Sequence, residues 1–226
     1  MVVGIIGAMK IEIENLLKHM ENVTVEKISG ITYQNGVIGK VRVVAAVCGI
    51  GKVNASICAQ TMCIKYSPDY LINIGVAGSL SKDLKVGDVV AASSVVQHDI
   101  DSIQLGLPLG LIPVVEAVHI KCSEKLIAKL SEFDGVKHGI IATGDQFVWR
   151  KETKDFISEN FQAVATEMEG GSIGQVCYIN NVDFVVIRCI SDNADEDSDI
   201  VFEKYLEETA QKSIDLVVRL LSELPD

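Results

Sequence analysis

Residues 161–178 read FQAVATEMEGGSIGQVCY, and this stretch combines the two kinds of element from which the fold is predicted. The apolar run 161–165 is typical of a short strand, and 170–178 has the small residues of a closely packed helix. Glu167 and Glu169 stand between them, where a strand end turns into a helix. A buried carboxylate needs a partner, so we expect one of the two glutamates to face either water or a ligand.

The alternation of strand and helix continues along the chain. Short β-branched runs predict strands at 2–6, 41–47, 70–74, 89–96, 138–143 and 184–190. Several of these runs are apolar on both faces, as in a sheet that helices cover on each side. Apolar residues recur at helical spacing in 9–20, after Ser123 and in 202–221. No linker or repeat interrupts the pattern, so residues 1–226 are predicted to form one α/β domain with a central mixed sheet flanked by helices.

Composition argues against several classes of partner. The chain has 226 residues, of which 48% are hydrophobic, so it is long enough to bury a full core. Its formal charge of −11 makes binding to nucleic acid or to an anionic membrane unfavourable. No apolar run approaches the roughly 20 residues that span a bilayer, and the start MVVGIIGAM lacks the basic residues of a signal sequence. We therefore expect a cytoplasmic protein that binds a small molecule.

Neither the cysteines nor the acidic clusters predict a metal site. The cysteines lie mostly in apolar runs without a CxxC pair and are interpreted as core residues in a reducing compartment. His98, Asp99 and Asp101 could ligate a cation, but no second set of ligands accompanies them. The acidic run 192–199 begins like a calcium loop, yet Ile200 stands where such a loop requires glycine. We expect no metal and no cofactor.

Two glycine-containing turns resemble phosphate-binding motifs without matching them. GIGKVNAS at 49–56 lacks the earlier glycine of a P-loop and has Val53 in place of serine or threonine. GIIGAM at 4–9 has the wrong glycine spacing for a dinucleotide-binding motif. Ligands of open α/β sheets bind at the carboxyl ends of the strands, so we interpret both segments as tight turns beside a ligand cleft.

Carboxylates follow three of the predicted strands. Glu12 comes shortly after the first strand, Glu169 follows 161–165, and Asp192 follows 184–190. Neighbouring strands would bring these groups around one cleft, where an acid and a base suit cleavage of a glycosidic bond. For Glu12 alone, an exposed helix glutamate is the simpler interpretation. Only the combination indicates this chemistry.

The motifs GIIGAMKIEIENL, CGIGKVNA, NIGVAGSL with KDLKVGDVV, ATGDQF, ATEMEGGSIGQVC and VIRCISDNAD extend the argument. Their order resembles that of the 5′-methylthioadenosine/S-adenosylhomocysteine nucleosidases, which belong to the purine nucleoside phosphorylase superfamily. The resemblance runs from residue 2 to about residue 220. It implies a cofactor-free homodimer that hydrolyses the N-glycosidic bond of methylthioadenosine, adenosylhomocysteine and 5′-deoxyadenosine and releases adenine.

The resemblance also implies a role for each carboxylate. Glu12 corresponds to the base that activates water, and Asp192 to the acid that protonates adenine N7. Glu169 corresponds to the carboxylate that holds the ribose hydroxyls, and Met168 would pack below the sugar. Glu167 is then expected to be structural.

Further positions follow from the same motifs. Phe147 would stack on the purine, the backbone of Val148 would bind its edge, Ser191 would orient Asp192, and Arg188 would support the site. The other implied substrate-binding residues are Met9, Ile50, Val76, Ala77, Gly78 and Phe202.

An apolar connecting segment points to assembly. Residues 105–115 are rich in leucine and valine without a helical or strand period, which is typical of an interface. In the family this loop reaches over the neighbouring subunit's 5′-tail pocket. Leu105, Leu107 and Pro113 would contribute to that pocket, where aromatic residues are common in relatives.

Alternatives remain open at this point. Val76 replaces a serine found in many family members, and HDIDSIQLGLPLGLIP at 98–113 resembles the branch that also cleaves 6-amino-6-deoxyfutalosine. A phosphorylase would need a cationic phosphate contact, for which Lys52 and Arg188 are the candidates, although the charge of Glu12 would repel phosphate. A non-catalytic adenosine sensor could lose Glu12 or Asp192, but both are present.

Overall fold

The computed structural model describes residues 1–224, and within them one mixed sheet of ten strands organises the chain. The strands are β1 (Val2–Gly7), β2 (Glu21–Ile28), β3 (Ile31–Ile38), β4 (Val41–Val47), β5 (Tyr70–Ser79), β6 (Val89–Gln97), β7 (Ile120–Lys121), β8 (Val136–Thr143), β9 (Ala163–Glu167) and β10 (Asp183–Asp192). Their order is β10-β6-β8-β9-β5-β1-β4-β3-β2, and β7 pairs with β6. Because β10 also pairs with β5, half of the sheet closes on itself.

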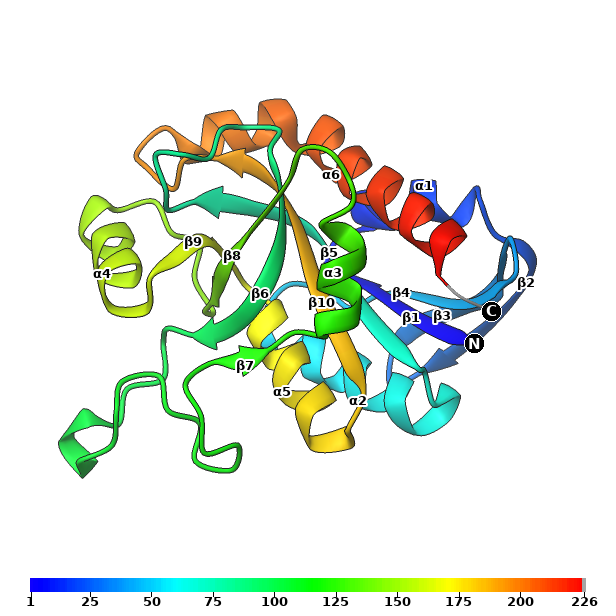
Figure 1. The fold of residues 1–226 in the computed structure, drawn as a ribbon, viewed down its shortest axis with the longest axis horizontal. Coiled ribbons are helices and arrows are strands. Elements are labelled where there is room, and N and C mark those ends of the chain that lie inside the picture. Colours follow the sequence, from blue (N-terminus) through cyan, green and yellow to red (C-terminus); the bar gives the residue numbers. More distant parts are fainter. Residues whose placement is uncertain (225–226) are drawn as a thin grey trace.

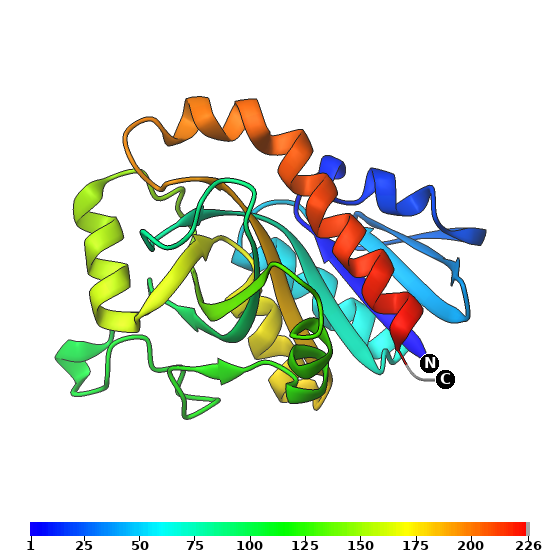
Figure 2. The same cartoon turned by 45° about the horizontal axis from the view of Figure 1, so that its top comes forward.

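Helices cover both sides of this sheet. They are α1 (Glu14–Leu17), α2 (Lys52–Tyr66), α3 (Glu124–Leu130), α4 (Lys151–Phe161), α5 (Gly170–Asn180) and α6 (Ser198–Glu223), with short 3-10 turns at Lys10–Glu12 and Ile103–Leu105. The long helix α6 lies along one side, and α2 and α5 pack together on the other (Figures 1 and 2). Between residues 1 and 224, no helix is both long and apolar enough to cross a membrane.

The predicted α/β fold with a central mixed sheet is confirmed. The runs predicted as strands at 2–6, 41–47, 70–74, 89–96, 138–143 and 184–190 all lie in strands, most of whose residues are buried. The predicted C-terminal helix is part of α6, and the cysteines are buried and free of disulfides. Continuous apolar runs of this kind are typical of strands with both faces covered.

Two predictions needed correction. The strand expected at 161–165 is displaced to β9, because Phe161 still belongs to α4 and Gln162 ends that helix with a φ of +54°. The helix expected over 9–20 breaks into a 3-10 turn and the four-residue α1. It breaks because the side chain of Glu12 turns back to accept the backbone N–H groups of Ala8 and Met9.

The sheet brings the ends of several strands to one place. β1, β4, β5 and β10 run parallel to their neighbours in the order β4-β1-β5-β10, so their carboxyl ends share one edge. β9 runs antiparallel to the end of β5 and places Thr166 opposite Gly78. The segments that follow these strands therefore meet around one cavity.

Candidate active site

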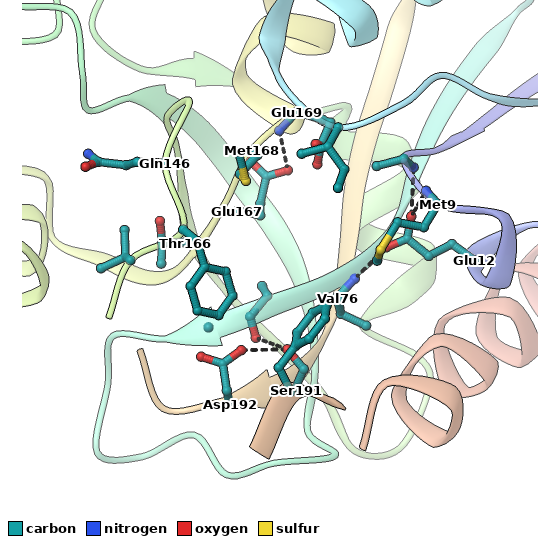
Figure 3. Close-up of a pocket in the computed structure, with 17 residues that line it drawn as sticks. Met9, Glu12, Val76, Gln146, Thr166, Glu167, Met168, Glu169, Ser191 and Asp192 are labelled. Carbon is teal, nitrogen blue, oxygen red and sulfur yellow. Dashed lines mark hydrogen bonds between the residues drawn. The ribbon is translucent and has the colours of Figure 1, made fainter. Parts of the chain in front are cut away.

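A cavity lined mostly by apolar side chains and backbone, with a few carboxylates, opens at this edge, as is typical of a small-molecule site. The residues predicted from the motifs that line it are Met9, Glu12, Ile50, Val76, Ala77, Gly78, Phe147, Val148, Met168, Glu169, Ser191, Asp192 and Phe202. Figure 3 shows how the labelled ones converge from the turn after β1, from β5, from the end of β9 and the residues that follow it, and from the end of β10. Ala8, Gln146, Thr166 and Glu167 also line the cavity. Each of these four lies within one of the quoted motifs, which is the signal that could have identified it.

Glu12 is held by the turn that follows β1. Its Oε2 accepts the N–H groups of Ala8 at 2.7 Å and Met9 at 2.8 Å, and its Oε1 accepts the N–H of Val76 at 3.3 Å. Only 3% of Glu12 is exposed. Burial raises the pKa of Glu12, against the opposing effects of the Arg188 charge and the backbone donors. A carboxylate with a raised pKa and a fixed orientation is suited to accept a proton from water.

Asp192 ends β10 on another wall of the cavity. The hydroxyl of Ser191 donates to its Oδ2 at 2.8 Å, and the N–H of Ala194 donates to its Oδ1 at 2.9 Å. Burial raises the pKa of Asp192, and these two donors act in the opposite direction. A raised pKa favours the protonated form, which is the form that can act as a general acid.

Glu169 contacts the turn between β4 and α2. Its Oε1 accepts the N–H of Gly51 at 2.8 Å, and its Oε2 lies 3.7 Å from the guanidinium of Arg188. Burial, followed by the neighbouring charge of Glu167, raises the pKa of Glu169 to about 8.

Glu167 has several protein partners. It forms a buried ion pair with Arg188, accepts the hydroxyl proton of Thr143, and accepts the N–H groups of Glu169 at 3.0 Å and Gly170 at 2.7 Å. These bonds tie the start of α5 to β8 and β10. They support the expectation that Glu167 is structural, although it also lines the cavity.

Arg188 does not line the cavity. It is 1% exposed and lies behind the two glutamates, where its Nη2 also donates to Asn73 Oδ1 at 2.6 Å. Its guanidinium is paired with Glu167 and lies near Glu169, so it offsets carboxylate charge beside the cavity without reaching the cavity surface. The tertiary orientation of a strand residue decides this, and the motif alone did not reveal it.

Leu105, Leu107 and Pro113 lie outside the cavity. They belong to the long connection between β6 and β7, which extends away from the sheet (Figure 1, green). Leu105 is 80% exposed.

Aromatic rings stand at one side of the cavity. The rings of Phe147 and Phe202 meet edge to face with centroids 5.8 Å apart, and Phe147 remains 44% exposed. Phe202 comes from the first turns of α6, so this helix contributes to the site as well as to the core. An exposed ring beside a carboxylate pair is able to stack on a planar base.

The acidic residues of the described part of the chain, 1–224, form no group of three or more ligands that could hold a metal ion. Asp99 is instead paired with Lys52, and His98 is buried.

Comparison with known proteins agrees with this geometry. The model of the phosphorylase superfamily matches residues 2–222. The chain is 38% identical to the 5′-methylthioadenosine/S-adenosylhomocysteine nucleosidase of Shewanella pealeana, over 99% of this chain and 100% of that protein. It is 39% identical to the aminodeoxyfutalosine nucleosidase of Helicobacter pylori, over 98% of each.

A solved structure shows the same fold. The crystal structure of a mutant of the Helicobacter pylori methylthioadenosine/adenosylhomocysteine nucleosidase, with 5′-methylthioadenosine in the active site, superimposes with a TM-score of 0.95 at 36% identity over 98% of each chain. Matches of this extent confirm the resemblance carried by the motifs. The chain belongs to the phosphorylase superfamily, in the group that contains the 5′-methylthioadenosine/S-adenosylhomocysteine and aminodeoxyfutalosine nucleosidases.

Proposed function

We propose that this protein hydrolyses the N-glycosidic bond of adenine nucleosides with a modified 5′ position, namely methylthioadenosine, adenosylhomocysteine and 5′-deoxyadenosine. One observation carries the proposal: Glu12 and Asp192 face the same cavity from two strand ends, and burial raises the pKa of both. An acid and a base in one cavity are what hydrolysis of a glycosidic bond requires. The names of the relatives support the same reaction.

The two carboxyl groups divide the reaction between them. Asp192 donates its proton to N7 of adenine while the bond between C1′ and N9 breaks, and the bonding electron pair leaves with the base. Glu12 accepts a proton from water as the water oxygen bonds to C1′. Neutral adenine and the free 5-substituted ribose are then the products. Glu12 releases its proton to solvent, and Asp192 takes up a proton from solvent. Protonation matters because neutral adenine is a better leaving group than its anion.

Other residues hold the substrate in this proposal. Glu169 accepts hydrogen bonds from the ribose hydroxyls, and Met168 packs below the sugar. Phe147 stacks on the purine, and the backbone of Val148 binds its edge. Their common position around the cavity supports these roles.

The lining of the cavity favours water over phosphate as the nucleophile. No lysine or arginine lines it among residues 1–224, whereas a phosphorylase needs cationic donors for a dianion. The ammonium of Lys52 is paired with Asp99 at 2.6 Å, and Arg188 is paired with Glu167. The negative charge of Glu12 would repel phosphate and still activate water.

A second substrate is favoured by a specific comparison. The Helicobacter pylori relative is named an aminodeoxyfutalosine nucleosidase. We therefore include 6-amino-6-deoxyfutalosine among the candidate substrates. It would use the same base and ribose contacts and differ in what the 5′ side of the pocket must accept.

We extend the proposal to a homodimer that works in the cytoplasm. Leu105 and Val114, in the connection between β6 and β7, are 80% and 69% exposed, and apolar surface of this kind supports an interface with a second copy. The six buried, free cysteines fit a reducing compartment.

A base-release assay tests the function. The purified protein is incubated separately with methylthioadenosine, adenosylhomocysteine and aminodeoxyfutalosine, with and without phosphate. We expect free base and free 5-substituted ribose at a rate that phosphate does not change. A ribose 1-phosphate product would overturn hydrolysis in favour of phosphorolysis, and binding without base release would identify a sensor.

A further inference from the structure

Asp99, at the end of β6, joins two segments that lie on different walls of the cavity. Its Oδ1 accepts a proton from the Lys52 ammonium at 2.6 Å, and its Oδ2 accepts the backbone N–H of Asp145 at 3.0 Å. Lys52 begins α2, and Asp145 lies in the connection between β8 and α4. Both oxygens of one carboxylate are therefore used to hold separate parts of the chain.

A further bond closes these contacts into a ring. The backbone N–H of Lys52 donates to Oδ1 of Asp145 at 2.7 Å. The two segments also pack closely, because a methyl group on Gly51 would lie 3.0 Å from the same oxygen. Asp99, Lys52 and Asp145 thus form a ring of three mutual hydrogen bonds that we call the Asp99 ring.

Each side of the Asp99 ring leads directly into the cavity. Gly51, next to Lys52, donates its N–H to Glu169 Oε1 at 2.8 Å. On the other side, Asp145 is followed by Gln146, Phe147 and Val148, which line the cavity. Asp99 and Lys52 do not line it themselves.

The segment from Asp145 to Val148 contains no helix or strand, so few backbone bonds fix it. Phe147 is 44% exposed, and Ile50 on the opposite turn is 54% exposed. Apart from the contact of the Phe147 ring with Phe202, little packing holds these two side chains, and the hydrogen bonds of the Asp99 ring are available to fix their backbone.

We propose that Asp99 is a positioning residue that clamps the segment carrying Phe147 to the turn that orients Glu169. The inference rests on the proposed function, in which Phe147 contacts the base and Glu169 the ribose. Asp99 fixes the distance between these two contacts without touching the substrate. An ion pair at the partly exposed edge of the fold adds only modestly to stability, so we expect its loss to affect alignment in the site more than folding.

Asp88 offers a closely matched control. Its carboxylate also accepts one lysine ammonium, from Lys137 at 2.8 Å, and one backbone N–H, from Lys85 at 2.7 Å. Its side chain is 27% exposed, compared with 25% for Asp99. It does not line the cavity. Asp88→Asn therefore removes the same kind of interaction at a place where alignment of the site does not depend on it.

The experiment compares Asp99→Asn with Asp88→Asn. Wild type and both variants are measured for thermal stability, for kcat and KM of adenine release, and for acrylamide quenching of Trp149, the one tryptophan of the chain. Trp149 follows Val148 directly and is 45% exposed, so it reports on the segment that Asp99 holds. We expect Asp99→Asn to lower kcat/KM roughly 10- to 100-fold, as expected for misaligned groups, and to increase quenching of Trp149. Asp88→Asn should leave both within about two-fold of wild type.

The double variant Asp99→Asn with Lys52→Met adds a second check. If the pair acts as one unit, the double variant loses no more kcat/KM than Asp99→Asn alone. Equal effects of Asp99→Asn and Asp88→Asn on kcat/KM and on quenching would overturn the proposal. If the wild type releases no adenine, the proposed function fails, and the quenching comparison alone then decides whether Asp99 holds the segment.

Discussion

Gly75 and the carboxylate of Glu12 are in such close contact that a methyl group on Gly75 would lie 2.5 Å from Glu12 Oε1. The same methyl group would lie 3.4 Å from Nη1 of Arg188. Gly75 sits in β5 directly opposite Arg188 in β10. The absence of a side chain at this position is therefore what leaves room for the proposed base.

Gly75→Ala should displace Glu12 and slow turnover, and it should also lower stability, because the φ of +156° at Gly75 strains any residue with a side chain. We expect kcat to fall roughly 100-fold, because a group shifted by about 1 Å loses its alignment with the attacking water. Glu12→Gln, which cannot accept the proton, should bind substrate and turn over still more slowly. Steady-state kinetics and circular dichroism of both variants check this. A Gly75→Ala protein with wild-type kcat would show that the position of Glu12 is not critical.

Asp192→Asn should separate binding from catalysis. Asparagine retains the shape of the side chain but has no acidic proton for N7, so the rate should fall by about 10² to 10⁴. Substrate affinity, measured by calorimetry, should change little. Ser191→Ala removes the hydroxyl that donates to Asp192 at 2.8 Å and should have a smaller effect on the rate. Turnover of Asp192→Asn close to that of the wild type would remove Asp192 from the role of acid.

Glu169→Gln should change how stability depends on pH. The pKa of Glu169 rises from 4.5 to about 8 on folding, so the folded protein holds this proton more tightly than the unfolded chain does. Its stabilising contribution is complete below about pH 4.5 and is lost as the pH rises through about 8. The wild-type Tm should therefore fall over this range. The Tm of Glu169→Gln should fall less, because the glutamine side chain is neutral at every pH.

Calorimetric Tm values between about pH 6 and pH 9 test this expectation. Glu26→Gln is the control, because Lys65 lowers the pKa of the exposed Glu26 and its contribution is lost only at low pH. Parallel curves of Tm against pH for the wild type and Glu169→Gln would contradict the raised pKa.

The role of Glu169 in binding the ribose is tested separately. Cleavage of 2′-deoxy substrates as fast as ribosides would argue against that role.

Parts of the fold with continuous apolar runs could be predicted from the sequence, and parts with mixed composition could not. β1, β4 and β10 are buried nearly throughout and were predicted. The hairpin of β2 and β3 was not predicted, because β2 is exposed along almost its whole length and its apolar alternation is limited to Val23 and Val25. Helix α4 was also missed, since only Ile157 and Phe161 are buried in it.

The motifs predicted which residues form the candidate site more completely than they predicted how those residues are arranged in space. The motif residues converge on one cavity because they follow strands that end at one edge. The sequence did not indicate that Arg188 points behind the glutamates, or that Asp99 joins two walls of the site. Both depend on how distant segments pack, which local patterns do not record.

The exposed surface suggests how two copies would meet. On α2, Val53, Ile57 and Ile64 are 69%, 42% and 73% exposed and share one face at helical spacing. On the adjacent helix α5, Tyr178 and Ile179 are 55% and 51% exposed. Exposed apolar side chains gathered on two neighbouring helices are typical of an interface.

The last prediction follows from this surface. Light scattering should give the mass of a dimer, and Ile57→Asp should produce monomers, because a charge placed at the centre of an apolar interface must be buried without a partner. The monomer should keep its fold but lose much of its activity, since the family resemblance places the partner's loop over the 5′-tail pocket. Glu203→Gln, on an exposed position of α6, is a control that should leave the dimer intact.

Leu105→Ala should leave the dimer intact and raise KM for methylthioadenosine more than for adenosine, which lacks the apolar tail. A monomer with full activity at assay concentration would show that the site is complete within one chain.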